Sequence, residues 1–151
     1  MIFDLKVQIY NKLMKSLDRT LQTSMAAIQS VKESKTNETK SSAGDKFETG
    51  RAMMQEEEDR NERQHLKTMS LKNFLLQIDI NKQFKTVQTG SLVYTNQGNY
   101  FISIGHGKVM INNEIYYAIS IDSPIGQLLR GKGIGDKTIF QNKNIIINNI
   151  G

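Results

Sequence analysis

The sequence predicts an α+β protein, with a long N-terminal antiparallel helical hairpin of the coiled-coil kind followed by a small β-rich domain with one short helix. Two observations indicate this. The first half of the chain carries apolar residues at helical spacing on both sides of one cluster of turn formers. The second half consists of short runs of β-branched and aromatic residues separated by turn signals. We place the hairpin at residues 1–82 and the β-rich domain at residues 83–151.

The first helix is expected from residue 4 to about residue 40, a stretch without glycine or proline. Its apolar residues recur every three or four positions and form one stripe: Leu5, Ile9, Leu13, Leu17, Leu21, Met25, Ile28 and Val31. Residues 36–45 collect turn formers and include Gly44, the first glycine of the chain, so the helix should end there.

A second helix is expected from about residue 46 to residue 80, and the turn of the hairpin should lie near residues 41–48. Its apolar residues lie near its start, at Ala52, Met53 and Met54, and towards its end, at Leu66, Met69, Phe74, Leu75 and Ile78. Residues 55–65 are almost wholly polar. We therefore expect the acidic run Glu56–Asp59 to face solvent, with pairs along the helix such as Glu56 with Arg60.

Five strands are expected in the β-rich domain, at residues 87–94, 99–104, 114–121, 138–140 and 144–150. Between the third and fourth, Ser123 should cap a short helix that begins at Pro124, continues over residues 125–130 and is ended by Gly131.

Composition excludes several classes of function. The chain of 151 residues has no cysteine, which removes disulfides, thiolate metal sites and thiol catalysis. It has no apolar run of membrane-spanning length and no signal-peptide layout, so we expect a cytoplasmic protein without membrane contact. His65 and His106 have no partner at ligand spacing, and we expect both at the surface. Nothing in the sequence indicates a self-contained active site.

The net charge of +5 is unevenly distributed, with an acidic zone at residues 41–65 between two basic zones. Basic zones suit contact with nucleic acid or with an acidic protein surface.

Two carboxylates lie three residues apart in Gly44-Asp45-Lys46-Phe47-Glu48, where the second helix begins. Two interpretations stay open from the residues alone. Asp45 and Glu48 can lie on one helical face and share a divalent cation. They can also form a variant of the capping box, in which an acidic residue caps the helix and the Glu three residues later completes the cap.

These parts together resemble the Gre family of bacterial transcript-cleavage factors. The resemblance rests on Gly-Asp-x-x-Glu at the turn of a helical hairpin, followed by a β domain that contains Ser123-Pro124-Ile-Gly-Gln-Leu-Leu-Arg-Gly-Lys132 and then Gly135-Asp136. It covers nearly the whole chain and implies that the C-terminal domain is FKBP-like. It further implies that this domain binds RNA polymerase near the mouth of the secondary channel, while the coiled coil reaches inwards.

The resemblance also implies roles for individual residues. Asp45 and Glu48 at the tip would help to hold a catalytic Mg²⁺ and its attacking water, so that polymerase cleaves the 3′ end of backtracked RNA. Asp122, Ser123 and Pro124 would lie in the loop that docks on polymerase. The protein would then be a monomer that stimulates the nuclease activity of polymerase and is no enzyme by itself. It would share Mg²⁺ with polymerase, hold no cofactor when free, and contact DNA and RNA only through the polymerase complex.

Two alternatives remain. After the tip glutamate the family continues with an Asn and then an acidic-aromatic pair, whereas this chain has Thr49-Gly50-Arg51-Ala52. This departure keeps open a channel-binding regulator or inhibitor of polymerase that does not stimulate cleavage. The other alternative is a coiled-coil interaction module unrelated to transcription.

Overall fold

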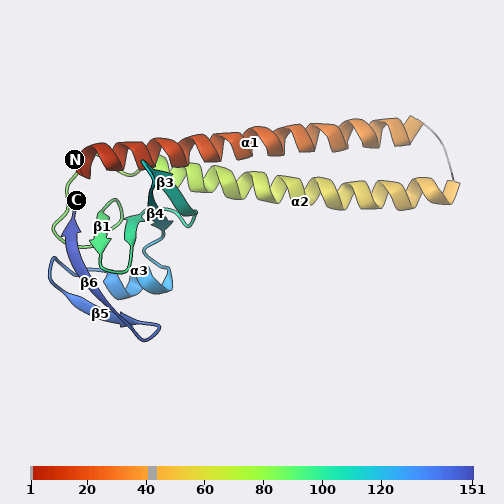
Figure 1. Cartoon of the computed structure of the whole chain (residues 1–151). Helices are drawn as coiled ribbons and strands as arrows, with labels where there is room; N and C mark the ends of the chain where they lie inside the picture. The colour runs from red at the N-terminus through yellow and green to blue at the C-terminus, as the bar shows by residue number, and fades with distance from the viewer. Residues whose placement is uncertain (1, 41–43) are drawn as a thin grey trace. The chain divides into compact units, whose positions relative to one another are not determined.

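The computed structural model describes the backbone of residues 2–40 and 44–151 and the side chains of residues 2–37 and 49–151. Two long helices, α1 (Ile2–Lys40) and α2 (Gly44–Leu76), precede a sheet and a short helix (Figure 1). The remaining elements are β1 (Leu92–Thr95), β2 (Asn99–Ile102), β3 (Gly107–Ile111), β4 (Glu114–Ile119), α3 (Pro124–Leu129), β5 (Lys137–Phe140) and β6 (Lys143–Ile150). The predicted α+β class is confirmed.

The chain divides into two compact units. One unit is the helical hairpin of residues 16–72. The other joins residues 1–15 to residues 73–151, so the first turns of α1 and the end of α2 belong with the sheet. The expected boundary at residue 82 stays a prediction about which fragment folds alone.

The two long helices end close to where the sequence predicts. α1 ends at Lys40 and α2 begins at Gly44, inside the segment of turn formers, while residues 41–43 lie outside the described part of the chain. α2 ends at Leu76, four residues earlier than expected. The chain turns there because Asp79 supports a new turn: its side chain accepts a hydrogen bond from the amide of Asn81 at 3.0 Å, and its carbonyl accepts one from the amide of Lys82 at 3.2 Å.

The six strands form one mixed sheet in the order β3-β4-β2-β1-β6-β5. β2 and β4 run parallel, and every other neighbouring pair runs antiparallel. Two-residue turns close the β3–β4 and β5–β6 hairpins. In the first, Asn112 and Asn113 have φ of 51° and 66°, the conformation that a type I′ turn needs at both central positions.

One strand, β3, is missing from the sequence-based expectation. The sequence Gly105-His106-Gly107 is typical of a turn, yet β3 starts at Gly107. From Lys108 to Ile111 the side chains alternate between exposed and buried, with Met110 on the exposed side. An exposed methionine weakens the contrast between polar and apolar positions on which strand prediction depends.

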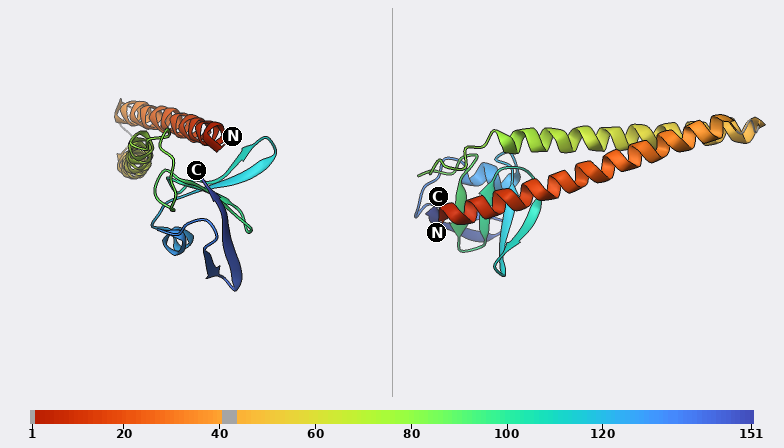
Figure 2. Two further views of the ribbon diagram at one scale, coloured as in Figure 1. Left: turned by 90° about the vertical axis from the view of Figure 1, so that its left-hand side faces the viewer. Right: turned by 90° about the horizontal axis from the view of Figure 1, so that it is seen from above.

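The sheet is covered on both faces. Leu129 of α3 belongs to a buried cluster with Val93, Ile102 and Ile147. Figure 1 and the left view of Figure 2 place α3 and the first turns of α1 on opposite sides of the sheet, and Ile9 and Leu13 of α1 are fully buried.

Lysine side chains fix the first turns of α1 to the rest of this unit. Lys6 is almost completely buried, and its Nζ donates a hydrogen bond of 2.8 Å to the carbonyl of Lys82 and lies 5.2 Å from the centroid of the Phe84 ring. Burial lowers the pKa of Lys6, and the nearby negative charge of Asp79 opposes that shift. Lys12 donates a 2.6 Å hydrogen bond to the carbonyl of Met110 on β3.

Candidate functional site

The predicted tip carboxylates stand at the start of α2. The backbone of Asp45 and Glu48 is helical, because α2 begins at Gly44. Their side chains lie outside the described residues. The role of Asp45 and Glu48 in holding a cation therefore stays a prediction from the resemblance.

Behind the turn, α1 and α2 face each other along a seam with strict heptad spacing. We define the seam by residues that are at least partly buried and alternate by three and four positions. On α1 these are Leu17, Leu21, Ser24, Ile28, Val31 and Lys35, and on α2 they are Met54, Glu58, Asn61, His65, Thr68 and Lys72. Such spacing is that of a coiled coil. The α1 side is largely apolar, but most of the α2 side is polar.

Polar pairs cross the seam at three levels. At the level farthest from the turn, Lys72 forms an ion pair with Asp18 at 2.6 Å. In the middle, Ser24 Oγ lies 2.6 Å from His65 Nδ1 and also donates to the carbonyl of Leu21 at 3.0 Å. The tautomer of His65 decides which of the two atoms donates in the Ser24–His65 bond.

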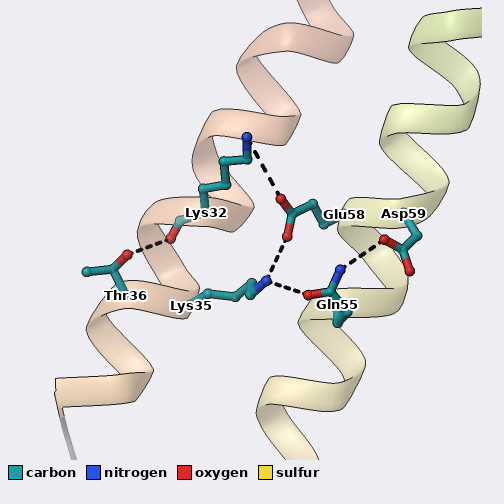
Figure 3. A network of polar contacts seen from close by, with 6 residues as sticks. All are labelled: Lys32, Lys35, Thr36, Gln55, Glu58 and Asp59. Carbon is teal, nitrogen blue, oxygen red and sulfur yellow. Dashed lines mark hydrogen bonds and ion pairs between the residues drawn. The ribbon is translucent and has the colours of Figure 1, made fainter.

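The third level, nearest the turn, is a network around Glu58 (Figure 3). One carboxylate oxygen accepts from Lys35 at 2.8 Å, and the other lies 4.0 Å from Lys32. Lys35 also donates to Gln55, whose amide donates to Asp59 at 2.9 Å. Because Glu58 is only 6% exposed, its charge depends on these lysines for compensation.

Two sequence-based expectations are wrong here. Glu58 does not face solvent with the rest of the acidic run but is buried between the helices. His65 is partly buried and bonded across the seam instead of lying free at the surface. A heptad count on α2 that ignores polarity would have found both residues, since they occupy equivalent seam positions one heptad apart.

Some residues of the predicted apolar stripes do not face the other helix. Met25, Leu66 and Met69 are exposed, at 61%, 62% and 42%. On α1 the predicted stripe repeats every four residues from Leu5 to Met25, and each such step turns the helix by about 40° beyond a full circle. By Met25 the stripe has rotated off the seam, where Ser24 takes its place.

The second predicted site, at Asp122, Ser123 and Pro124, is a turn that leads into α3. Asp122 and Pro124 are exposed, whereas Ser123 caps the helix. Ser123 Oγ accepts from the amide of Gly126 at 3.1 Å and donates to the carbonyl of Ser120 at 2.7 Å. The cap and the Pro124 start confirm the predicted helix, and they present Asp122 and Pro124 as neighbours on the surface.

The tight geometry of this turn depends on Gly126. A Cβ at that position would lie 2.4 Å from the carbonyl oxygen of Ser120 and 2.8 Å from that of Ile121. Both atoms are backbone, so no side-chain rotation could relieve the clash. The loop that carries Asp122 is thus held against the first turn of α3 by a close backbone approach.

Two aromatic residues of the sheet, Phe101 and Tyr116, belong to its buried core. Tyr116 is buried, its ring meets that of Tyr94 edge to face at 6.3 Å, and its hydroxyl donates to Glu114 at 3.0 Å. Burial, together with the hydrogen bonds to Tyr94 and Glu114, raises the pKa of Tyr116 far above its ordinary value.

The residues with described side chains contain no group of three or more potential metal ligands. In the part of the chain that the structure describes, no helix is both long enough and apolar enough to cross a membrane.

Comparisons with known proteins give one likeness. No protein-family model matches the chain, and no curated protein matches it. A solved structure, described as that of the transcription factor Gfh1, aligns over 94% of this chain and 92% of that chain, with 18% sequence identity and a TM-score of 0.34. A likeness at this level does not establish membership of a family.

Proposed function

We propose that this protein regulates bacterial RNA polymerase by docking on it through the loop at Asp122–Pro124 and reaching its active centre with the helical hairpin. Two kinds of support exist. The sequence resembles the Gre family both at the hairpin turn and at the loop before α3. The order of the elements, a long hairpin followed by a β-rich part, is also the order that this function requires.

The observation that carries the proposal is the hairpin itself. α2 has 33 residues, which corresponds to roughly 50 Å of helix at about 1.5 Å per residue, and it starts next to the carboxylate-bearing turn. Because helix stability comes mainly from packing of an apolar face, the polar seam of this hairpin does not account for its length. The Asp45-x-x-Glu48 pair is the chemistry available there.

At the tip, Asp45 and Glu48 would supply hard oxygen ligands of the kind that Mg²⁺ prefers. Two carboxylates are too few for an octahedral ion, so the remaining ligands would come from polymerase, RNA and water. A bound Mg²⁺ lowers the pKa of its water and stabilises a leaving oxygen, which is the chemistry of hydrolytic RNA cleavage. The part played by this chain is to position the two carboxylates.

A second candidate function, inhibition without cleavage, is favoured by the residues after Glu48. Gly50 lies in the first turns of α2, where glycine costs about 1 kcal/mol relative to alanine. A loosened first turn would position Glu48 poorly for metal ligation, although the hairpin could still obstruct the channel.

The deciding experiment is RNA cleavage by a stalled, backtracked polymerase with and without the protein. Faster shortening of the 3′ end supports the cleavage factor. Slower shortening or slower elongation, with binding to polymerase retained, supports the inhibitor. Absence of binding to polymerase in co-sedimentation would refute both and leave the interaction module.

A further inference from the structure

The hairpin leaves a partly apolar face open on one side of its seam. We define the open face by the residues that directly follow seam positions: Met25, Gln29 and Lys32 on α1, and Glu62, Leu66 and Met69 on α2. One residue corresponds to about 100° of helix rotation. Because α1 and α2 run in opposite directions, this rotation brings both sets to the same side of the hairpin.

A groove on this side confirms that the two sets meet. It has a volume of about 460 Å³ and is lined from α1 by Met25, Ile28, Gln29 and Lys32 and from α2 by Glu62, His65 and Leu66. Two of these lining residues, Ile28 and His65, belong to the seam. The hairpin has therefore placed polar residues in its interior and several of its larger apolar side chains outside.

This arrangement is unusual for a helix pair that acts alone. Burial of apolar surface is the main source of hairpin stability, so Leu66 and Met69 would be expected inside and Glu58 and Thr68 outside. The structure shows the reverse, with Glu58 and Thr68 buried. Exposed apolar side chains grouped along a groove are typical of an interaction surface.

We propose that a second copy of this hairpin covers the open face, so that α1 of each copy lies on α2 of the other. The charges at the groove argue for this occupant. The α1 rim carries Lys32 and the α2 rim carries Glu62. When α1 of one copy lies over α2 of the other, each Lys32 meets a Glu62 and each Met25 meets a Leu66, and the contact is the same on both sides of a two-fold axis.

The available area fits a weak dimer. The face as defined extends from Met25 to Lys32 on α1 and from Glu62 to Met69 on α2, roughly 10 Å along each helix. Even with two helices side by side, a contact of this length buries less area than a standard specific interface. We expect a dimer that forms at high concentration, with the monomer expected from the resemblance as the dilute form. This inference does not depend on the proposed function.

The test is sedimentation velocity of the full chain over a concentration series. The parent protein should shift from monomer to dimer. Leu66→Gln should weaken the association by about tenfold or more, as for a central contact. Met53→Gln should not change it, because Met53 is equally exposed, at 67%, but lies on a different side of α2.

A charge exchange identifies the occupant. Lys32→Glu alone and Glu62→Lys alone should each abolish the dimer, because like charges then face each other. An equimolar mixture of the two variants should restore it, since all Lys–Glu contacts reappear in the mixed pair. Circular dichroism of each variant must show an intact hairpin, since Lys32 also lies near Glu58. A parent protein that stays monomeric throughout, or a mixture that fails to associate, would overturn the proposal.

Discussion

Lys35 and Glu58 face each other across the hairpin seam, with 2.8 Å between Nζ and Oε2. Glu58 is the more deeply buried partner, and the pair lies in the half of the hairpin nearest the turn, where the sequence offers little apolar surface. A buried charged pair contributes little net stability compared with apolar residues, but it penalises every alignment of the helices that separates the partners. The pair therefore fixes which residues of α1 and α2 stand opposite each other.

This relationship predicts an asymmetric response to mutation. Glu58→Ala should destabilise the hairpin by about 3 kcal/mol, because Lys35 is left partly buried without its carboxylate. Replacing both residues, with Lys35→Met and Glu58→Leu, should restore most of the stability. Hydrogen exchange of the α1 and α2 amides between residues 30–37 and 53–62 measures the effect. Equal exchange in Glu58→Ala and in the parent would contradict the structural role of the pair.

A second prediction concerns the turn before α3. Gly126→Ala should destabilise the sheet-containing unit by about 2–3 kcal/mol, as in other overpacked sites, because its Cβ would overlap the carbonyl of Ser120. It should also weaken binding to polymerase if Asp122 and Pro124 dock there. Gly105→Ala is the matched control, since a Cβ at Gly105 meets nothing within 4 Å. Thermal unfolding of both variants measures the effect. Similar melting temperatures would contradict the close approach of Gly126 to the carbonyl of Ser120.

The sequence predicts those elements whose signals lie within a few neighbouring residues. The Ser123 cap and the Pro124 start act within one turn of backbone, and both are found as predicted. β3 was missed because its evidence is not local: Met110 is exposed, and the strand exists through pairing with β4.

The hairpin interior was the least predictable part. An apolar stripe on α2 predicts that Leu66 and Met69 face α1, yet seam spacing and the polar pairs at Glu58 and His65 give a different rotation of the helix. Pattern reading assigns polar side chains to solvent because an unpaired buried charge is costly. The pattern of α2 alone carries no information about Lys35, which lies on α1 and compensates the buried charge of Glu58. The tip chemistry is predictable only through the family resemblance, because two carboxylates three residues apart are equally a helix cap.

A third prediction uses the buried phenol of Tyr116. Its raised pKa means that the folded state holds the proton at pH values where the unfolded chain has released it. The stabilisation is thus complete below pH 10, the ordinary value for tyrosine, and is lost as the pH rises above it. Urea unfolding between pH 8 and pH 11 should show falling stability above pH 10.

The variant Tyr116→Phe separates this effect from others. It removes the hydroxyl and should cost about 1 kcal/mol at neutral pH through the lost bond to Glu114. Above pH 10 its stability should fall less steeply than that of the parent. Some loss of stability above pH 10 should remain in this variant, because burial also raises the pKa values of Tyr94 and Tyr100. The lowered pKa of Lys6 has the opposite effect and increases stability as the pH rises just below 10.5. If stability fell equally steeply with pH in the two proteins, the pKa of Tyr116 would not be raised in the folded state.

The last prediction concerns the tip and depends on the proposed function. If the protein stimulates cleavage, Asp45→Asn combined with Glu48→Gln should abolish stimulation and leave affinity for polymerase nearly unchanged. The reason is that metal ligation at the tip matters in the transition state, whereas the docking loop supplies binding in both the ground state and the transition state. Asp122→Ala combined with Pro124→Ala should lower the affinity for polymerase and leave the maximal stimulation unchanged, so that stimulation is recovered at high protein concentration.

A matched control removes two negative charges elsewhere on the same helix. Glu56→Gln with Glu57→Gln changes the net charge by the same amount at two exposed positions of α2, and stimulation should persist. Cleavage rates at saturating protein, together with affinities from a binding titration, distinguish the cases. Full stimulation by the Asp45/Glu48 double variant would show that the carboxylates act only as a helix cap. Loss of affinity in that variant would show that the tip contributes to docking, and the separation between a binding loop and a catalytic tip would then have to be abandoned.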